Sequence, residues 1–158
     1  MRVKLLLIAF LTLALLAGPL IATDSPQVGE EERKVTVEGI CWCWVYFPST
    51  AKPGDWFPVR VRLKALREMD FIVSVRVIHG WGRFSDWDKV IDTHLGIFDE
   101  AKGTTAVKIP EDVETGPIYI WLDIGYSDIN HYTKKGGEYY YVSDGWILTG
   151  PYVRGITP

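Results

Sequence analysis

Strict alternation of apolar and charged side chains is the feature that most constrains this chain. Residues 57–66 are apolar at odd-numbered positions and carry Arg60, Arg62 and Lys64 at even-numbered positions. A period of two is that of a β-strand, whose successive side chains point to opposite faces. One face of this strand is therefore expected in a core and the other in water.

Similar strand-like segments recur along the chain and are separated by turn residues. In Lys52-Pro53-Gly54-Asp55, Pro and Gly suit the two central positions of a β-turn. The other predicted strands are 35–47, 71–79, 90–98, 104–109, 118–126 and 138–148, the last with a turn or bulge at Asp144-Gly145. No segment longer than a turn or two has a helical period. About seven short strands predict an all-β fold, a single antiparallel β-sandwich.

Two of the turns resemble those of extracellular immunoglobulin-like and fibronectin-like adhesion modules. The turn at 52–55, followed by VRVRL at 59–63, resembles their passage from strand A to strand B. VKIPED at 107–112, followed by GPIYI at 116–120, is similar to their passage from strand E to strand F. The resemblance implies an immunoglobulin-like sandwich with an extracellular binding or spacer role and no active site. It lacks the Cys-Trp-Cys spacing of antibody domains, because no cysteine follows Cys43.

The amino terminus has the layout of a secretory signal. Arg2 and Lys4 precede an uncharged run over residues 5–22, which Gly18-Pro19 interrupts near its end. Cleavage would follow Ala22 or Ala17. Because the run is also long enough to span a bilayer, residues 1–22 are either a signal peptide or a retained membrane anchor. In both cases the rest of the chain is expected outside the cell, secreted or on the cell surface.

The remaining chain divides into an acidic leader at 23–34, predicted to be flexible, and a sandwich domain at 35–158. Without residues 1–22, the 17 Lys and Arg fall to 15 against 20 Asp and Glu, a net charge of −5. This acidic balance argues against nucleic acid as a partner, and membrane contact is expected only through residues 5–22 if they are retained.

Thermolabile side chains are scarce. Asn130 is the one asparagine and Gln27 the one glutamine, and Met69 is the one methionine after the initiator. Depletion of these residues is typical of hyperthermophilic proteins, so a hot-living microbial source is expected.

Aromatic residues supply the candidate binding surfaces. Trp42, Trp44 and Tyr46 share one face of a strand whose other face is also apolar, so they are either covered by long neighbouring side chains or exposed to stack on a ligand. Trp81 and Trp87, in a loop, are further stacking candidates. Two explanations are open for a further aromatic group: its members either pack in the core and at strand edges, or they form a second aromatic surface. The group consists of residues 139–141, Tyr119, Trp121 and Trp146.

Cys41 and Cys43 allow three interpretations. They are buried free thiols, a strained local or an intermolecular disulfide, or, with one of the three histidines, a soft-metal site. Spacing on a strand does not decide between the three.

Four carboxylates stand in or beside two loops and are candidate calcium ligands, the alternative being solvated loop acids. They are Asp86, Asp88, Asp123 and Asp128. Their spacing does not match an EF-hand loop.

No nucleophile motif, phosphate-binding loop or dinucleotide fingerprint is present, so no catalytic residue, no resident cofactor and no enzyme activity are expected. The sequence favours an exported, non-catalytic binding or structural module whose partner is an extracellular protein, a glycan or a second copy. Two more specific functions are alternatives to this general one. The first is a carbohydrate-binding module that uses exposed Trp and Tyr, and the second is a subunit of a surface filament or sheath assembled by strand addition.

Overall fold

The structure is a computed structural model that describes residues 25–79, 82–83, 85–127, 133–135 and 138–155. For residues 82–83, 133–135 and 138–140 it describes the backbone alone. The predicted signal or anchor at 1–22 lies outside the described residues. Within them, no helix has the length and apolar character needed to cross a membrane.

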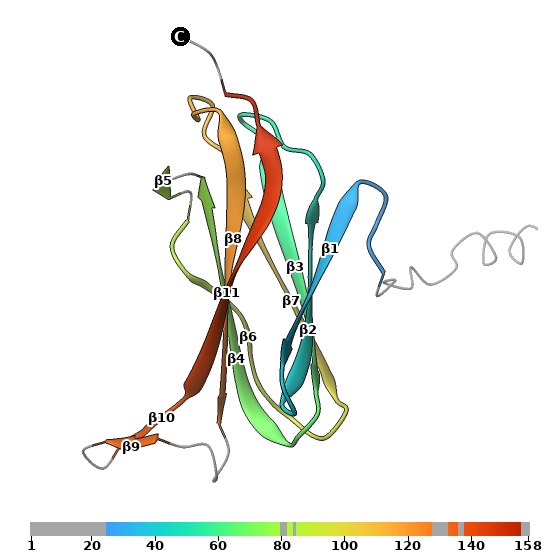
Figure 1. The fold of residues 1–158 in the computed structure, drawn as a ribbon, viewed down its shortest axis with the longest axis vertical. Coiled ribbons are helices and arrows are strands. Elements are labelled where there is room, and N and C mark those ends of the chain that lie inside the picture. Colours follow the sequence, from blue (N-terminus) through green and yellow to red (C-terminus); the bar gives the residue numbers. More distant parts are fainter. Residues whose placement is uncertain (1–24, 80–81, 84, 128–132, 136–137, 156–158) are drawn as a thin grey trace, which may run out of the picture.

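The first of two packed sheets contains four antiparallel strands in the order β1-β2-β3-β7 (Figure 1). Their bounds are β1 Glu30–Val37, β2 Cys41–Pro48, β3 Trp56–Ala65 and β7 Glu100–Lys108. Strand β1 forms a hairpin with β2 through a turn in which Gly39 has a φ of 68°. A positive φ suits glycine because it has no Cβ to clash with the backbone.

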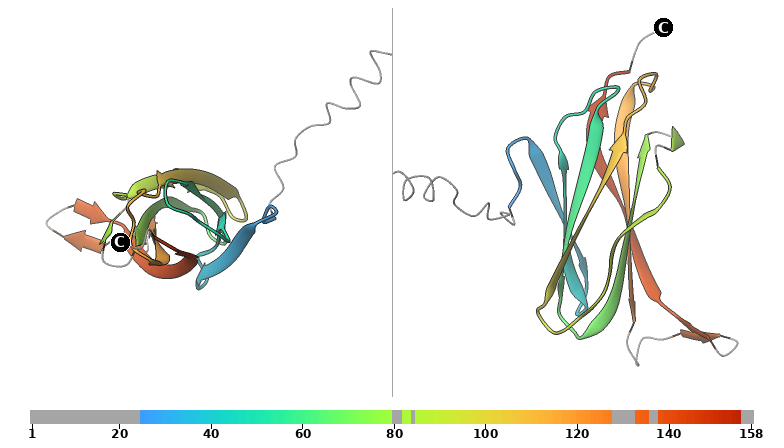
Figure 2. Two further views of the ribbon diagram at one scale, coloured as in Figure 1. Left: turned by 90° about the horizontal axis from the view of Figure 1, so that it is seen from above. Right: turned by 180° about the vertical axis from the view of Figure 1, so that it is seen from behind.

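The second sheet follows the order β11-β8-β4, and β5 and β6 both pair with β4. Its strands are β4 Met69–His79, β5 Gly82–Arg83, β6 Asp88–Leu95, β8 Gly116–Ser127 and β11 Val142–Val153. Two short strands, β9 Thr133–Lys135 and β10 Glu138–Tyr140, form a separate ribbon between β8 and β11 in the chain. The two curved layers face each other when the molecule is seen end on (Figure 2).

Strand pairing confirms the predicted immunoglobulin-like β-sandwich. Strand β3 lies beside β7 in one sheet, and β8 lies between β4 and β11 in the other. These are the B–E and C–F–G neighbours of immunoglobulin-like sandwiches. The turns at 52–55 and 109–115 lead from β2 to β3 and from β7 to β8, which matches the A-to-B and E-to-F passages that the sequence resembled.

Alternating side chains from both sheets form the core, as the sequence pattern predicted. Every second residue of β3, β4 and β8 is buried over most of each strand. The largest fully buried aromatic side chains between the sheets are Phe47, Phe57 and Phe71. Each such side chain stabilises the fold by roughly 1.5–3 kcal/mol through removal of apolar area from water.

The sheets meet along one side of the sandwich where β6 lies against β7. An ideal Cβ on Gly103 of β7 would be 2.0 Å from the carbonyl oxygen of Val90 on β6. No side chain fits in that space, so glycine at this position allows the two backbones to approach.

Two predictions about local structure are wrong. Residues 30–34 are not part of a flexible leader, because they belong to β1 and pair with residues 44–48 of β2. The segment 35–47 is accordingly two strands and a turn. Asp144 and Gly145 form neither a turn nor a bulge: they pair regularly with Ile124 and Asp123, and the irregularity in β11 falls between Thr149 and Tyr152.

Candidate functional site

Both sheets carry tryptophans on their outer faces, and the two faces differ in what covers the rings. On the first sheet, β2 presents Trp42, Trp44 and Tyr46 between the charged strands β1 and β3. On the second sheet, Trp121 of β8 lies beside Trp87, which directly precedes β6. These two faces carry tryptophans that the sequence singled out as stacking candidates or as part of an aromatic surface and that the structure describes.

Cationic side chains cover the tryptophans of the first sheet. The guanidinium carbon of Arg62 lies 4.0 Å from the centroid of Trp44, and the Lys34 ammonium lies 4.5 Å from that of Trp42. The two rings meet edge to face with centroids 6.3 Å apart. Both tryptophans are half-buried beneath this layer, which leaves little ring surface for stacking.

Tyr46 is more deeply buried on the same face, with 2% of its surface exposed. Arg60 lies 4.8 Å over its ring and is held by a two-point contact with Glu30 of β1. Burial, the largest influence, raises the pKa of the Tyr46 hydroxyl. The sequence left two explanations open for the apolar outer face of β2. The structure agrees with the one in which long neighbouring side chains cover the aromatic rings.

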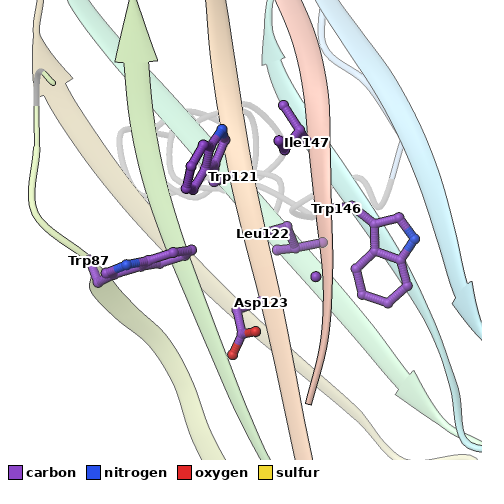
Figure 3. Close-up of a pocket in the computed structure, with 7 residues that line it drawn as sticks. Trp87, Trp121, Leu122, Asp123, Trp146 and Ile147 are labelled. Atoms are coloured by element: carbon purple, nitrogen blue, oxygen red, sulfur yellow. The ribbon is translucent and has the colours of Figure 1, made fainter. Parts of the chain in front are cut away.

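The second sheet, by contrast, has an open hollow beside two tryptophans (Figure 3). Trp87 and Trp121 have ring centroids 6.4 Å apart and planes inclined by 51°. Trp87 is 45% exposed. The Arg76 guanidinium lies 5.9 Å from the Trp87 centroid and 6.0 Å from that of Trp121.

The hollow measures about 320 Å³ and is bounded by β8 and β11. Its lining residues are Trp87, Trp121, Leu122, Asp123, Gly145, Trp146 and Ile147. A second hollow of about 360 Å³ shares Trp87 and Asp123 with the first and adds Ser74 of β4. Aromatic surface thus lies next to a carboxylate and a hydroxyl, the combination of apolar lining and few polar groups that small-molecule sites have.

Strand register explains why Ser74, Trp121 and Asp123 share the outer face of this sheet. Asp123 of β8 is opposite Ser74 of β4 on one side and Gly145 of β11 on the other. Trp121, two residues earlier, is opposite Arg76 and therefore points to the same face. Figure 3 shows Trp87, Trp121 and Asp123 grouped about β4 and β8, with Trp146 beyond β11.

Burial raises the pKa of Asp123 above its ordinary value. A side-chain hydrogen bond with Ser143 acts in the opposite direction, and the negative charge of Asp144 adds to the increase. A partly desolvated carboxylate accepts strong hydrogen bonds from ligand hydroxyl groups, because it has lost part of its hydration.

Sequence reasoning identified part of this site. The sequence indicated Trp87 as a stacking candidate and Trp121 as a member of a second aromatic surface. It did not predict that the two rings lie side by side. The other stacking candidate of that loop, Trp81, lies outside the described residues, as do the side chains of 139–140. The missed signal was the spacing of Trp121 and Asp123, two apart on one strand, which places both on one face.

The predicted calcium ligands do not converge in the way that the hypothesis required. Asp123 is in the middle of β8 rather than in a loop, while Asp88 begins β6 and Asp86 is in the segment before it. Asp128 lies outside the described residues. Among the described residues, no group of three or more His, Cys, Asp and Glu is arranged to hold a metal ion.

Cys41 and Cys43 are free thiols, fully buried on the inner face of β2. Desolvation raises the pKa of Cys41 to about 12 and raises that of Cys43 further. Thiols with such high pKa values stay protonated at neutral pH and are therefore poor nucleophiles and poor metal ligands.

No protein family model and no curated protein matches this sequence. Among solved structures, the chain is similar to the GAE domain of GGA2p from Saccharomyces cerevisiae, with 8% sequence identity and a TM-score of 0.36. The match covers 77% of this chain and 98% of that domain. The fold assignment rests on the strand pairing described above.

Proposed function

We propose that this β-sandwich is a non-catalytic module that binds neutral glycans outside the cell through the hollow beside Trp87 and Trp121. The observation that carries the proposal is the pair of ring centroids 6.4 Å apart next to the carboxylate of Asp123. Sugar rings have an apolar C–H face and a polar rim of hydroxyl groups. Tryptophan faces suit the former, and a carboxylate accepts hydrogen bonds from the latter.

The size and composition of the hollow support a small ligand segment rather than a large partner. Its volume of about 320 Å³ is at the lower end of the range for small-molecule sites. The signal-like residues 1–22 support a site of action outside the cell.

Tryptophan fluorescence gives the test. The purified protein is titrated with four hexasaccharides, cellohexaose, maltohexaose, mannohexaose and chitohexaose. At least one is expected to shift the emission with saturation, and Trp121→Ala is expected to weaken that binding at least tenfold. Trp56→Ala is the matched control, because Trp56 is 66% exposed on the first sheet and does not line the hollow. The absence of binding to all four sugars contradicts the proposal.

Self-assembly by strand addition receives less support than glycan binding. In that alternative the leader, residues 23–34, or a strand enters the sheet edge of the next copy. Residues 30–34 already pair with β2 of their own chain. The edge strand that they begin carries Glu31, Arg33 and Lys34, and charged side chains on an edge strand oppose edge-to-edge pairing.

A further inference from the structure

Gly145 occupies a position of β11 where nothing in the fold calls for a glycine. It pairs regularly with Asp123 in the middle of the strand. Positive φ among the described glycines is confined to Gly29, Gly39 and Gly54. An ideal Cβ on Gly145 would lie 3.7 Å from the Leu122 carbonyl oxygen and 3.8 Å from Asp123 Oδ1, which are ordinary contact distances.

At two other glycines of this sandwich, by contrast, the structure leaves too little room for a side chain. At Gly103, a Cβ would be 2.0 Å from the backbone of β6. At Gly150, a Cβ would be 3.2 Å from both the Ile118 carbonyl oxygen and the side chain of Ile120. A Cβ at either position displaces its neighbours, whereas a Cβ at Gly145 displaces none.

A glycine inside a strand weakens it, because the flexible backbone loses more entropy on folding and no side chain packs. Such a glycine often marks a place where a ligand approaches the backbone closely. Gly145 lines the same hollow as Trp121 and Asp123. A side chain at 145 would project into the space from which a ligand reaches the carboxylate.

We propose that Gly145 is a specificity-determining residue of the glycan site. It leaves room over β11 for a ring substituent, a hydroxyl or hydroxymethyl group, to donate a hydrogen bond to Asp123 while the ring lies against the tryptophans. This inference rests on the proposed function, because it assigns a role to one residue of that hollow. It adds that the size of the side chain at position 145 determines which ring substituents can reach Asp123.

The test compares Gly145→Ala and Gly145→Val with Gly125→Ala in titrations against the same four hexasaccharides. Gly125 is the matched control: it is a mid-strand glycine of the same sheet, its Cβ would meet nothing closer than 3.6 Å, and it does not line the hollow. We expect Gly145→Ala to weaken binding several-fold and Gly145→Val at least tenfold. Gly125→Ala is expected to bind like the wild type. The melting temperature of Gly145→Ala is expected to equal or exceed that of the wild type.

The outcomes separate this inference from the proposed function. If Gly145→Val binds within twofold of the wild type while Trp121→Ala does not bind, the hollow is the site and the role of Gly145 is wrong. If Trp121→Ala binds like the wild type, or no hexasaccharide binds at all, the proposed function fails and this inference fails with it. A lower melting temperature for Gly145→Ala shows a structural need for glycine, which also overturns the inference.

Discussion

Replacing Trp44 by alanine tests whether the aromatic face of the first sheet serves packing rather than binding. The half-buried ring lies under Arg62, at 4.0 Å, and Lys34, at 5.2 Å. Truncation removes on the order of 100 Å² of apolar surface that folding buries, and this burial is worth about 2.5 kcal/mol at roughly 25 cal/mol per Å². Each cation–π contact adds about 0.5 kcal/mol. The expected loss in free energy of unfolding is therefore about 3.5 kcal/mol.

Urea denaturation followed by far-ultraviolet circular dichroism measures this loss without relying on tryptophan emission. The control is Trp56→Ala, whose ring is 66% exposed and whose removal is expected to cost less than about 1 kcal/mol. Binding of hexasaccharides by Trp44→Ala is expected to be unchanged under conditions where the variant is folded. A loss below about 1 kcal/mol, together with loss of sugar binding, would show that this face is the binding surface and refute the reasoning.

Three further changes test other parts of the structure. Gly103→Ala places a Cβ 2.0 Å from the Val90 carbonyl oxygen. The variant is expected to lose at least about 3 kcal/mol of free energy of unfolding in the same urea assay. Wild-type stability of this variant would contradict the close approach of β6 and β7. The Arg60 contact lowers the pKa of Glu30 below its ordinary 4.5, so the pair stabilises the fold above that pH and the benefit is lost as pH falls through the lowered pKa. Glu30→Gln is expected to cost about 1 kcal/mol at pH 7 and less at pH 3, and equal losses at both pH values would falsify this assignment. Both buried cysteine thiols are expected to resist iodoacetamide in the folded protein and to react after unfolding; rapid alkylation of the native protein, or an intact mass showing a disulfide, would contradict their burial as free thiols.

Local alternation was sufficient to predict most of the fold. In β3, charged and apolar residues alternate so regularly that strand, inner face and outer face all follow from sequence. The same regularity held for β4 and β8, whose predicted spans differ from the observed ones by a few residues at their ends.

The failures occurred where a local pattern had two possible explanations. Glu30 to Lys34 is acidic and charged enough to suggest a flexible leader, yet the stretch forms an edge strand, because each of its residues pairs with β2. Asp144-Gly145 has the composition of a turn, but pairing with β8 keeps it extended. In both places, pairing with a strand that is distant in sequence determines the conformation. Local residue propensity does not contain information about such pairing.

The candidate site was only partly predictable for a related reason. Trp87 and Trp121 are far apart in sequence, and their proximity depends on β6 and β8 both pairing with β4. Sequence shows which residues share a face of one strand, but it does not show which strands are neighbours. Trp44 illustrates the converse, since its cover by Arg62 depends on the register of β2 with β3.

The most direct test of the proposed glycan site is a nuclear magnetic resonance titration of the tryptophan indole N–H signals. The chain has seven tryptophans, and each gives one such signal that can be assigned by substitution. Addition of the hexasaccharides is expected to shift the signals of Trp87 and Trp121 with a common saturation, while those of Trp42, Trp44 and Trp56 stay in place. Shifts confined to Trp42 and Trp44, or no shift of Trp87 and Trp121 with any of the four sugars, would contradict the account.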